Sequence, residues 1–148
     1  MSRINRQQGG FSLLEIMVVV VIIGILVASI APTLFGETEK ARLTRVKVDI
    51  TALEDALERY KMENFNYPTT DQGLESLITK SNMPPEPKHF KEGGYVRRIQ
   101  KDPWGNDYQY ISPGQEGPYD LFTLGADGEV GGEGANKDIG GWNLNEIN

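Results

Sequence analysis

The chain has 148 residues, enough for one domain with an accessory element but not for two full-sized cores. It contains no cysteine, which excludes disulfide bonds and thiolate chemistry. Its 15 basic and 21 acidic residues leave a net charge of −6, which excludes nucleic acid as a partner because neutralising phosphates requires a basic surface.

The first predicted element is an apolar helix near the amino terminus. Residues 16–36 (IMVVVVIIGILVASIAPTLFG) contain no charged side chain, and a stretch of about 20 apolar residues crosses a bilayer as a helix. Burial in a soluble core is the weaker interpretation, because the rest of the chain is too small to cover a helix that is apolar all round. A secretory signal peptide is the rival, but its cleavage site at Ala31 would be followed at once by Pro32.

Glu15 directly precedes this apolar run. An ionised carboxylate inside a membrane is costly unless it has a partner, so an intramembrane acid is a functional-site hypothesis by default. The alternative is that Glu15 lies at headgroup depth and has no special role. The residues alone leave both interpretations open.

The residues before the helix resemble a known processing signal. A basic leader, Gly10, Phe11, an acid four positions later and a long apolar helix resemble the class III signal of type IV pilins and pseudopilins. The resemblance implies that a prepilin peptidase cuts between Gly10 and Phe11, removes the leader 1–10 and methylates the new amino group of Phe11. It further implies a single membrane segment, and later a filament-core helix, at residues 11–36.

The same resemblance implies a role for Glu15 in assembly. Cleavage creates an ammonium group on Phe11, close to the carboxylate of Glu15. When subunits stack with their apolar helices in a filament core, the amine of one subunit neutralises Glu15 of its neighbour. An unpaired charge there would be costly, whereas a paired one fixes the axial register. The topology implied is a single-pass anchor in the inner membrane with residues 37–148 in the periplasm.

Beyond the apolar segment, the sequence predicts that the helix continues as far as 67–68, where proline ends it. Pro32 is expected to kink it. Thr70 or Asp71 is then predicted to cap a short helix through about Thr79. Apolar residues of the long helix recur at alternating spacings of three and four, which predicts one face packed on a small sheet rather than a free coiled coil: Leu43, Val46, Ile50, Leu53, Leu57 and Tyr60.

Short strands are predicted in the second half of the chain. Residues 108–111 and 119–124 have strand composition and are joined by a turn rich in glycine and proline, which predicts a hairpin. Residues 96–99 are a candidate third strand. Two or three strands against one helix make a small α+β domain.

Six later segments narrow the resemblance to the major pseudopilins of type II secretion systems. In chain order they are 67–74 (YPTTDQGL), 93–98 (GGYVRR), 102–108 (DPWGNDY), 112–114 (SPG), 124–128 (LGADG) and 138–140 (DIG). The resemblance implies a type IV pilin-like fold and a homopolymeric periplasmic filament that helps export folded proteins across the outer membrane. It also implies minor pseudopilins, an inner-membrane assembly platform and a cytoplasmic assembly ATPase as partners.

After Leu124 the sequence becomes rich in glycine and acid. Its oxygen donors could converge on Ca²⁺, which takes six to eight oxygen ligands, but no EF-hand pattern is present and spacing alone favours a solvated acidic loop. The resemblance reverses this interpretation, because major pseudopilins bind calcium in this loop. It implies Asp127, Asp138 and the carbonyl of Leu124 as ligands, with Asn136 and Glu133 as weaker candidates.

No catalytic motif occurs in the sequence. His89 is the only histidine and is expected on the surface. Asp102 and Asp107 flank Trp104 and could in principle form an acid–base pair, but a turn at Asp102 with Trp104 covering the core is the better interpretation. The sequence therefore predicts a structural subunit rather than an enzyme. A type IV pilus subunit for adhesion or motility, and a membrane-anchored periplasmic binding module, are the alternatives.

Overall fold

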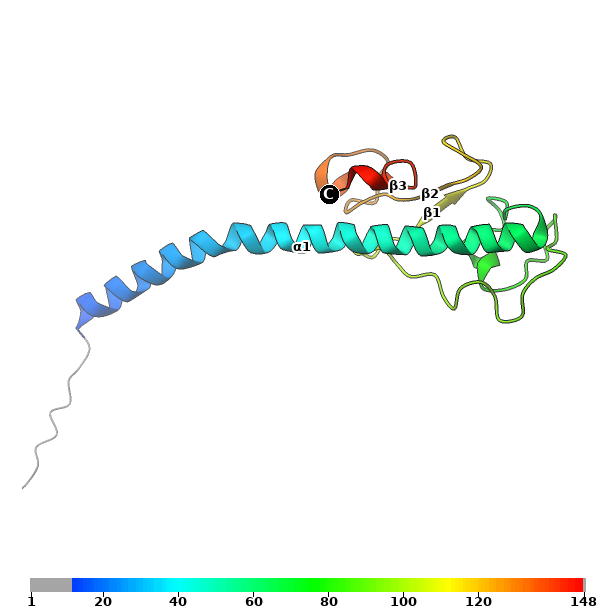
Figure 1. Ribbon diagram of the computed structural model, residues 1–148. Helices are drawn as coiled ribbons and strands as arrows, with labels where there is room; N and C mark the ends of the chain where they lie inside the picture. Colours follow the sequence, from blue (N-terminus) through cyan, green and yellow to red (C-terminus); the bar gives the residue numbers. More distant parts are fainter. Residues whose placement is uncertain (1–11, 148) are drawn as a thin grey trace, which may run out of the picture. The chain divides into compact units, whose positions relative to one another are not determined.

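The structure is a computed structural model that describes the backbone of residues 12–147 and the side chains of residues 12–27 and 38–147. The chain divides into two compact units, Met1–Thr38 and Glu39–Asn148. In chain order its elements, drawn in Figure 1, are α1 (Leu13–Asn64), η1 (Leu74–Leu77), β1 (Gln109–Ile111), β2 (Asp120–Thr123), η2 (Gly134–Asn136), β3 (Ile139–Gly140) and η3 (Leu144–Glu146). One long helix and a three-stranded antiparallel sheet confirm the predicted α+β class.

The first part of α1 carries the apolar run. The large apolar side chains from Leu13 to Val27 are 45–81% exposed. Within the described residues, no helical stretch is long and apolar enough to span a bilayer. The predicted kink at Pro32, and residues 28–36 of the predicted membrane segment, lie outside the described side chains. Both stay predictions.

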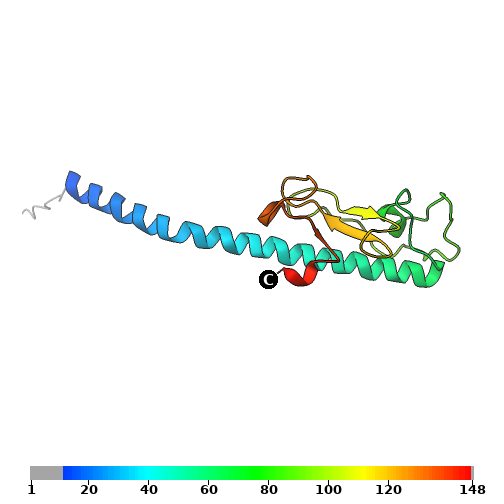
Figure 2. The ribbon, with the colours of Figure 1, turned by 90° about the horizontal axis from the view of Figure 1, so that it is seen from above.

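The second part of α1 buries the apolar face that its spacing predicts. Val46, Ile50, Leu57 and Tyr60 are completely buried, because steps of three and four residues return to the same side of a helix. This face packs in one core with side chains from η1 and all three strands, among them Leu77, Tyr110, Leu121 and Ile139. In Figure 2 the hairpin lies alongside this part of α1.

The sheet has the order β1-β2-β3. β1 and β2 form the predicted antiparallel hairpin, with Tyr110 opposite Leu121. The prediction of a third strand at 96–99 is wrong. The backbone amides of Tyr95 and Val96 instead donate to the carbonyl of Leu77, and the other edge of β2 pairs with β3.

The predicted short helix is only the four-residue 3-10 helix η1. The prediction that Thr70 or Asp71 caps it is wrong, because the N-cap residue is Gly73, which has no side chain to cap the helix. The Thr70 hydroxyl instead donates to the carbonyl of Ser112 at 3.1 Å and accepts from the Ser112 amide at 2.8 Å. Thr70 therefore joins this turn to the end of β1 rather than starting a helix.

Candidate functional site

The first turn of α1 contains Glu15. Ser12 lies directly before the helix, and its hydroxyl oxygen accepts a hydrogen bond from the Leu14 amide at 3.3 Å. Ser12 and Glu15 thus match the capping-box pattern, in which a serine is followed three residues later by a glutamate, and a carboxylate in the first turn also interacts favourably with the helix dipole. This helix-starting role was not predicted from the sequence, although the spacing of the two residues was its signal. Gly10 and Phe11 lie outside the described residues.

In the acidic loop, residues 124–138, the first residues lie against the later residues Ala135 and Asn136. The Ala126 amide donates to the carbonyl of Ala135 at 2.9 Å. Gly125 has a φ of 68°, and a Cβ there would lie 2.7–2.9 Å from backbone atoms of Ala135 and Asn136. Only glycine fits such a close approach of two backbones in the left-handed region. The loop therefore begins and ends at a fixed place beside β2.

Among the side chains predicted to bind calcium, Asp138 is the most enclosed. One carboxylate oxygen accepts from the Gly131 amide at 2.9 Å, and the Asp138 amide donates to the Gly131 carbonyl at 3.2 Å. The other oxygen, Oδ1, is buried and has no hydrogen-bond partner in the structure. A buried carboxylate oxygen without a partner is costly, and a bound cation would satisfy it. The chemistry of this residue therefore fits a calcium site.

The other predicted ligands are more open. Asp127, Glu133 and Asn136 are exposed, while Leu124 is half-buried just after β2. One Asp127 oxygen accepts from the Glu129 amide at 3.1 Å. Across the part of the chain that the structure describes, no three Asp, Glu, His or Cys side chains lie close enough together to hold a metal ion. Calcium would therefore need carbonyl oxygens as well as carboxylates, which its flexible coordination allows.

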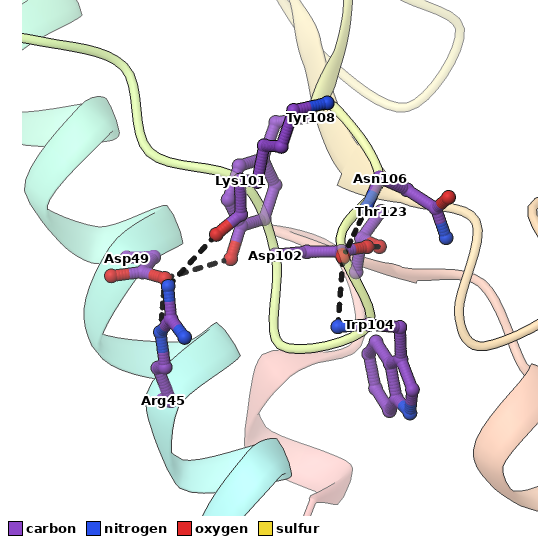
Figure 3. Close-up of polar contacts among 8 residues, drawn as sticks. All are labelled: Arg45, Asp49, Lys101, Asp102, Trp104, Asn106, Tyr108 and Thr123. Atoms are coloured by element: carbon purple, nitrogen blue, oxygen red, sulfur yellow. Dashed lines mark hydrogen bonds and ion pairs between the residues drawn. The ribbon is translucent and has the colours of Figure 1, made fainter.

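A buried carboxylate organises the neighbouring turn, shown in Figure 3. Asp102 is 3% exposed, and its Oδ1 accepts from the amides of Trp104 at 3.0 Å and Asn106 at 2.8 Å. Its Oδ2 accepts from the hydroxyl of Thr123, at the end of β2. These amide bonds confirm the predicted turn, and Trp104 packs against the core as predicted. The bond to Thr123 places the turn beside the start of the acidic loop.

A second polar group in Figure 3 ties α1 to the same turn. The Arg45 guanidinium donates to the carbonyl of Lys101 at 2.9 Å and lies 3.4 Å from an Asp49 carboxylate oxygen. The Tyr108 hydroxyl donates to that carboxylate at 3.1 Å. Burial, followed by the negative charge of Asp49, raises the pKa of Tyr108. These contacts hold the turn and β1 against the helix.

A depression of about 280 Å³ lies between α1 and the end of the hairpin. Glu54 and Glu58 line it from α1, and the rings of Tyr67, Tyr119 and Trp142 line it as well. Burial, followed by the nearby carboxylates, raises the pKa of Glu54. Carboxylates beside aromatic faces favour cationic groups over anionic ones.

His89 is exposed, as predicted for a surface histidine, and its ring makes an edge-on contact with the ring of Phe65.

Comparison with known proteins gives two matching family models. Residues 33–142 match the model described as "Type II secretion system (T2SS), protein G". Residues 5–31 match the prokaryotic N-terminal methylation motif. Together the two models cover the predicted processing signal, α1 and most of the domain that follows.

Individual relatives agree with the family models. The chain is 59% identical over 142 residues to type II secretion system core protein G of Vibrio cholerae serotype O1, covering 96% of this chain and 97% of the relative. It is 51% identical over 138 residues to the protein of the same name from Pseudomonas aeruginosa, covering 93% and 97%. A crystal structure of the major pseudopilin from the type 2 secretion system of enterohaemorrhagic Escherichia coli matches with a TM-score of 0.67 and 44% identity, covering 75% of this chain and 95% of that one.

Proposed function

This chain belongs to the protein G family of type II secretion systems, and we propose that it is the major subunit of a periplasmic secretion pseudopilus. The observation that carries the proposal is the 59% identity to a core protein G over 96% of the chain. A match of that extent includes the long helix and the acidic loop. The subunit acts by assembling rather than by catalysing a reaction.

The processing step we propose follows from the methylation motif at residues 5–31. A prepilin peptidase cuts between Gly10 and Phe11 and methylates the new amine. The segment 11–36 then anchors the subunit in the inner membrane, with residues 37–148 in the periplasm. Glu15 would pair with the Phe11 amine of a neighbouring subunit in the filament, and until then it supports the first turn of α1.

Assembly into a filament needs other components of the secretion system. We propose an inner-membrane platform and a cytoplasmic ATPase that drive the extraction of subunits, and minor pseudopilins that join the same filament. The homopolymer would then help move folded proteins across the outer membrane. The exposed apolar side chains in the first part of α1 support a helix that ends up surrounded by other helices, because such a surface is costly in water.

Calcium is the cofactor that we propose for the acidic loop. Asp138 would bind it through the buried oxygen that has no other partner, with Asp127 and the carbonyl of Leu124 as further ligands and Asn136 and Glu133 as additional candidates. The ion supplies a hard positive charge that oxygen donors prefer. Binding to the folded state alone would stabilise the loop by linkage, in a chain that has no disulfide.

The intact mass of the protein from its own host's membranes tests the processing pathway. A mass equal to residues 11–148 plus one methyl group is expected. A mass equal to residues 1–148 would contradict both processing and the filament that depends on it. Deletion then separates the two filament types. Loss of this subunit should trap exported proteins in the periplasm, whereas intact secretion with loss of long surface fibres would identify a type IV pilus subunit.

A further inference from the structure

An asparagine holds the first end of the acidic loop. The side-chain amide of Asn106 donates to the carbonyl of Gly125 at 2.8 Å. The same side chain lies under the following turn, where a Cβ added to Gly128 would be 3.6 Å from Asn106 Oδ1. Asn106 is itself fixed, because its backbone amide donates to the buried carboxylate of Asp102. The turn therefore contacts the residues on both sides of Leu124, Thr123 and Gly125, and Asn106 also lies beside Gly128, which directly follows Asp127.

A second asparagine holds the last end of the loop. Asn143 is 8% exposed, and its side-chain amide donates to the carbonyl of Asp138 at 3.0 Å. Its side-chain oxygen accepts from the Gly140 amide at 2.9 Å. The buried side chain of Asn143 thus bonds to the residues on both sides of Ile139. It fixes the backbone of Asp138, whose Oδ1 has no hydrogen-bond partner.

We propose that Asn106 and Asn143 are positioning residues for calcium: they hold Gly125 and Asp138, and so bring the two ends of the loop into a binding arrangement before the ion arrives. This inference rests on the calcium site proposed above. Both side chains are neutral, and the hydrogen bonds that their side-chain amide groups donate go to backbone carbonyls rather than to a carboxylate. Their contribution is therefore to orient the ligands, not to attract the ion.

The energetic reason lies in the composition of the loop. Segment 125–138 is rich in glycine, and Gly125, Gly128, Gly131, Gly132 and Gly134 all have positive φ values. Glycine loses more conformational freedom on ordering than other residues. Without fixed ends, calcium binding would have to order the whole segment, and affinity would fall. Groups that orient metal ligands typically change metal affinity by about 10- to 100-fold when removed.

The test is calcium titration of the full chain in detergent by calorimetry. Asn106→Ala and Asn143→Ala should each raise the calcium Kd by about 10- to 100-fold. Asn82, which is exposed shortly before Pro84 and Pro85, provides the matched control, and Asn82→Ala should leave the Kd within about twofold of wild type. Thermal unfolding in calcium and in EGTA provides the second readout, because a positioning role reduces the calcium-induced rise in Tm.

The outcomes separate positioning from simple structural support. An unchanged Kd, with Tm lowered equally in calcium and in EGTA, would overturn the inference for that residue. Failure of a variant to fold in EGTA would also overturn the inference, because the asparagine would then be needed for the fold itself. If wild type and variants alike bind no calcium, the calcium site falls, whereas wild-type binding with unaffected variants removes only the positioning role.

Discussion

Replacing Asp138 with asparagine separates calcium binding from folding. An asparagine side-chain oxygen can still accept the hydrogen bond that the Gly131 amide makes at 2.9 Å. The substitution also removes the negative charge whose second oxygen is buried without a partner. In EGTA we therefore expect the free energy of unfolding to change by about 1 kcal/mol or less.

The result in calcium should differ by more than that. A ligand that binds only the folded state stabilises it by about 2.7 kcal/mol at a concentration 100 times its Kd. The carboxamide that replaces the Asp138 carboxylate would be a neutral and weaker ligand, so most of this stabilisation should be lost. Since about 1 kcal/mol shifts Tm by roughly 4 °C or more in a domain of this size, the calcium-induced rise in Tm should fall by about 10 °C.

Thermal unfolding followed by circular dichroism measures both effects. Wild type and Asp138→Asn are compared in calcium chloride, in magnesium chloride and in EGTA, with the exposed Asp71 replaced by asparagine as the control. A variant that keeps the full calcium-induced rise in Tm would show that Asp138 is not a ligand. An equal loss in calcium and in EGTA would mean that the carboxylate stabilises the fold itself rather than binding calcium.

Three further predictions concern assembly, the loop and pH. Glu15→Ala should block filament formation, seen by electron microscopy, while the domain stays folded by circular dichroism; normal filaments would contradict the charge pairing. Gly125→Ala should lower the free energy of unfolding in urea by about 1–3 kcal/mol, because the new Cβ meets backbone at a φ of 68°, and a change below about 0.5 kcal/mol would argue against this close approach. Burial raises the pKa of Tyr95 and Tyr110 to about 12, above about 10 in the unfolded chain, so stability should be complete below about pH 10 and fall between pH 10 and 12. Tyrosinate absorbance and circular dichroism followed together test this, and stability that is flat across that range would contradict it.

The sequence predicted those parts of the fold that depend on a repeating local pattern. The buried face of α1 follows from steps of three and four residues between Val46 and Tyr60, which only a helix brings to one side. The hairpin follows from two short apolar runs around a turn. β3 has only two residues, Ile139 and Gly140, too few to show any alternation. It is a strand because β2 offers it a free edge, which is a property of the tertiary fold.

The same distinction applies to the candidate site. Glu15 was noticed because it is a charged residue beside an apolar run. The acidic loop was noticed because it is rich in glycine and acid. Asn106 and Asn143 were not, because a neutral amide that bonds to a distant backbone carbonyl has no periodicity or composition of its own. Their partners, Gly125 and Asp138, are brought near them only when the hairpin and β3 are in place. Asp102 was recognisable as a turn residue, but its bond to Thr123 was not.

The acidic loop and the core are stabilised by different forces. Val130 is the one large apolar residue in segment 125–138, and 86% of it is exposed, so burial of apolar surface contributes little to ordering this segment. The core, by contrast, rests on the completely buried face of α1. What holds the loop is a set of backbone hydrogen bonds, two asparagine side chains and the carboxylate of Asp138. In a chain without cysteine, an ion bound at Asp138 would strengthen the loop without altering the core, so the order of this surface would depend on calcium while the fold beneath it would not.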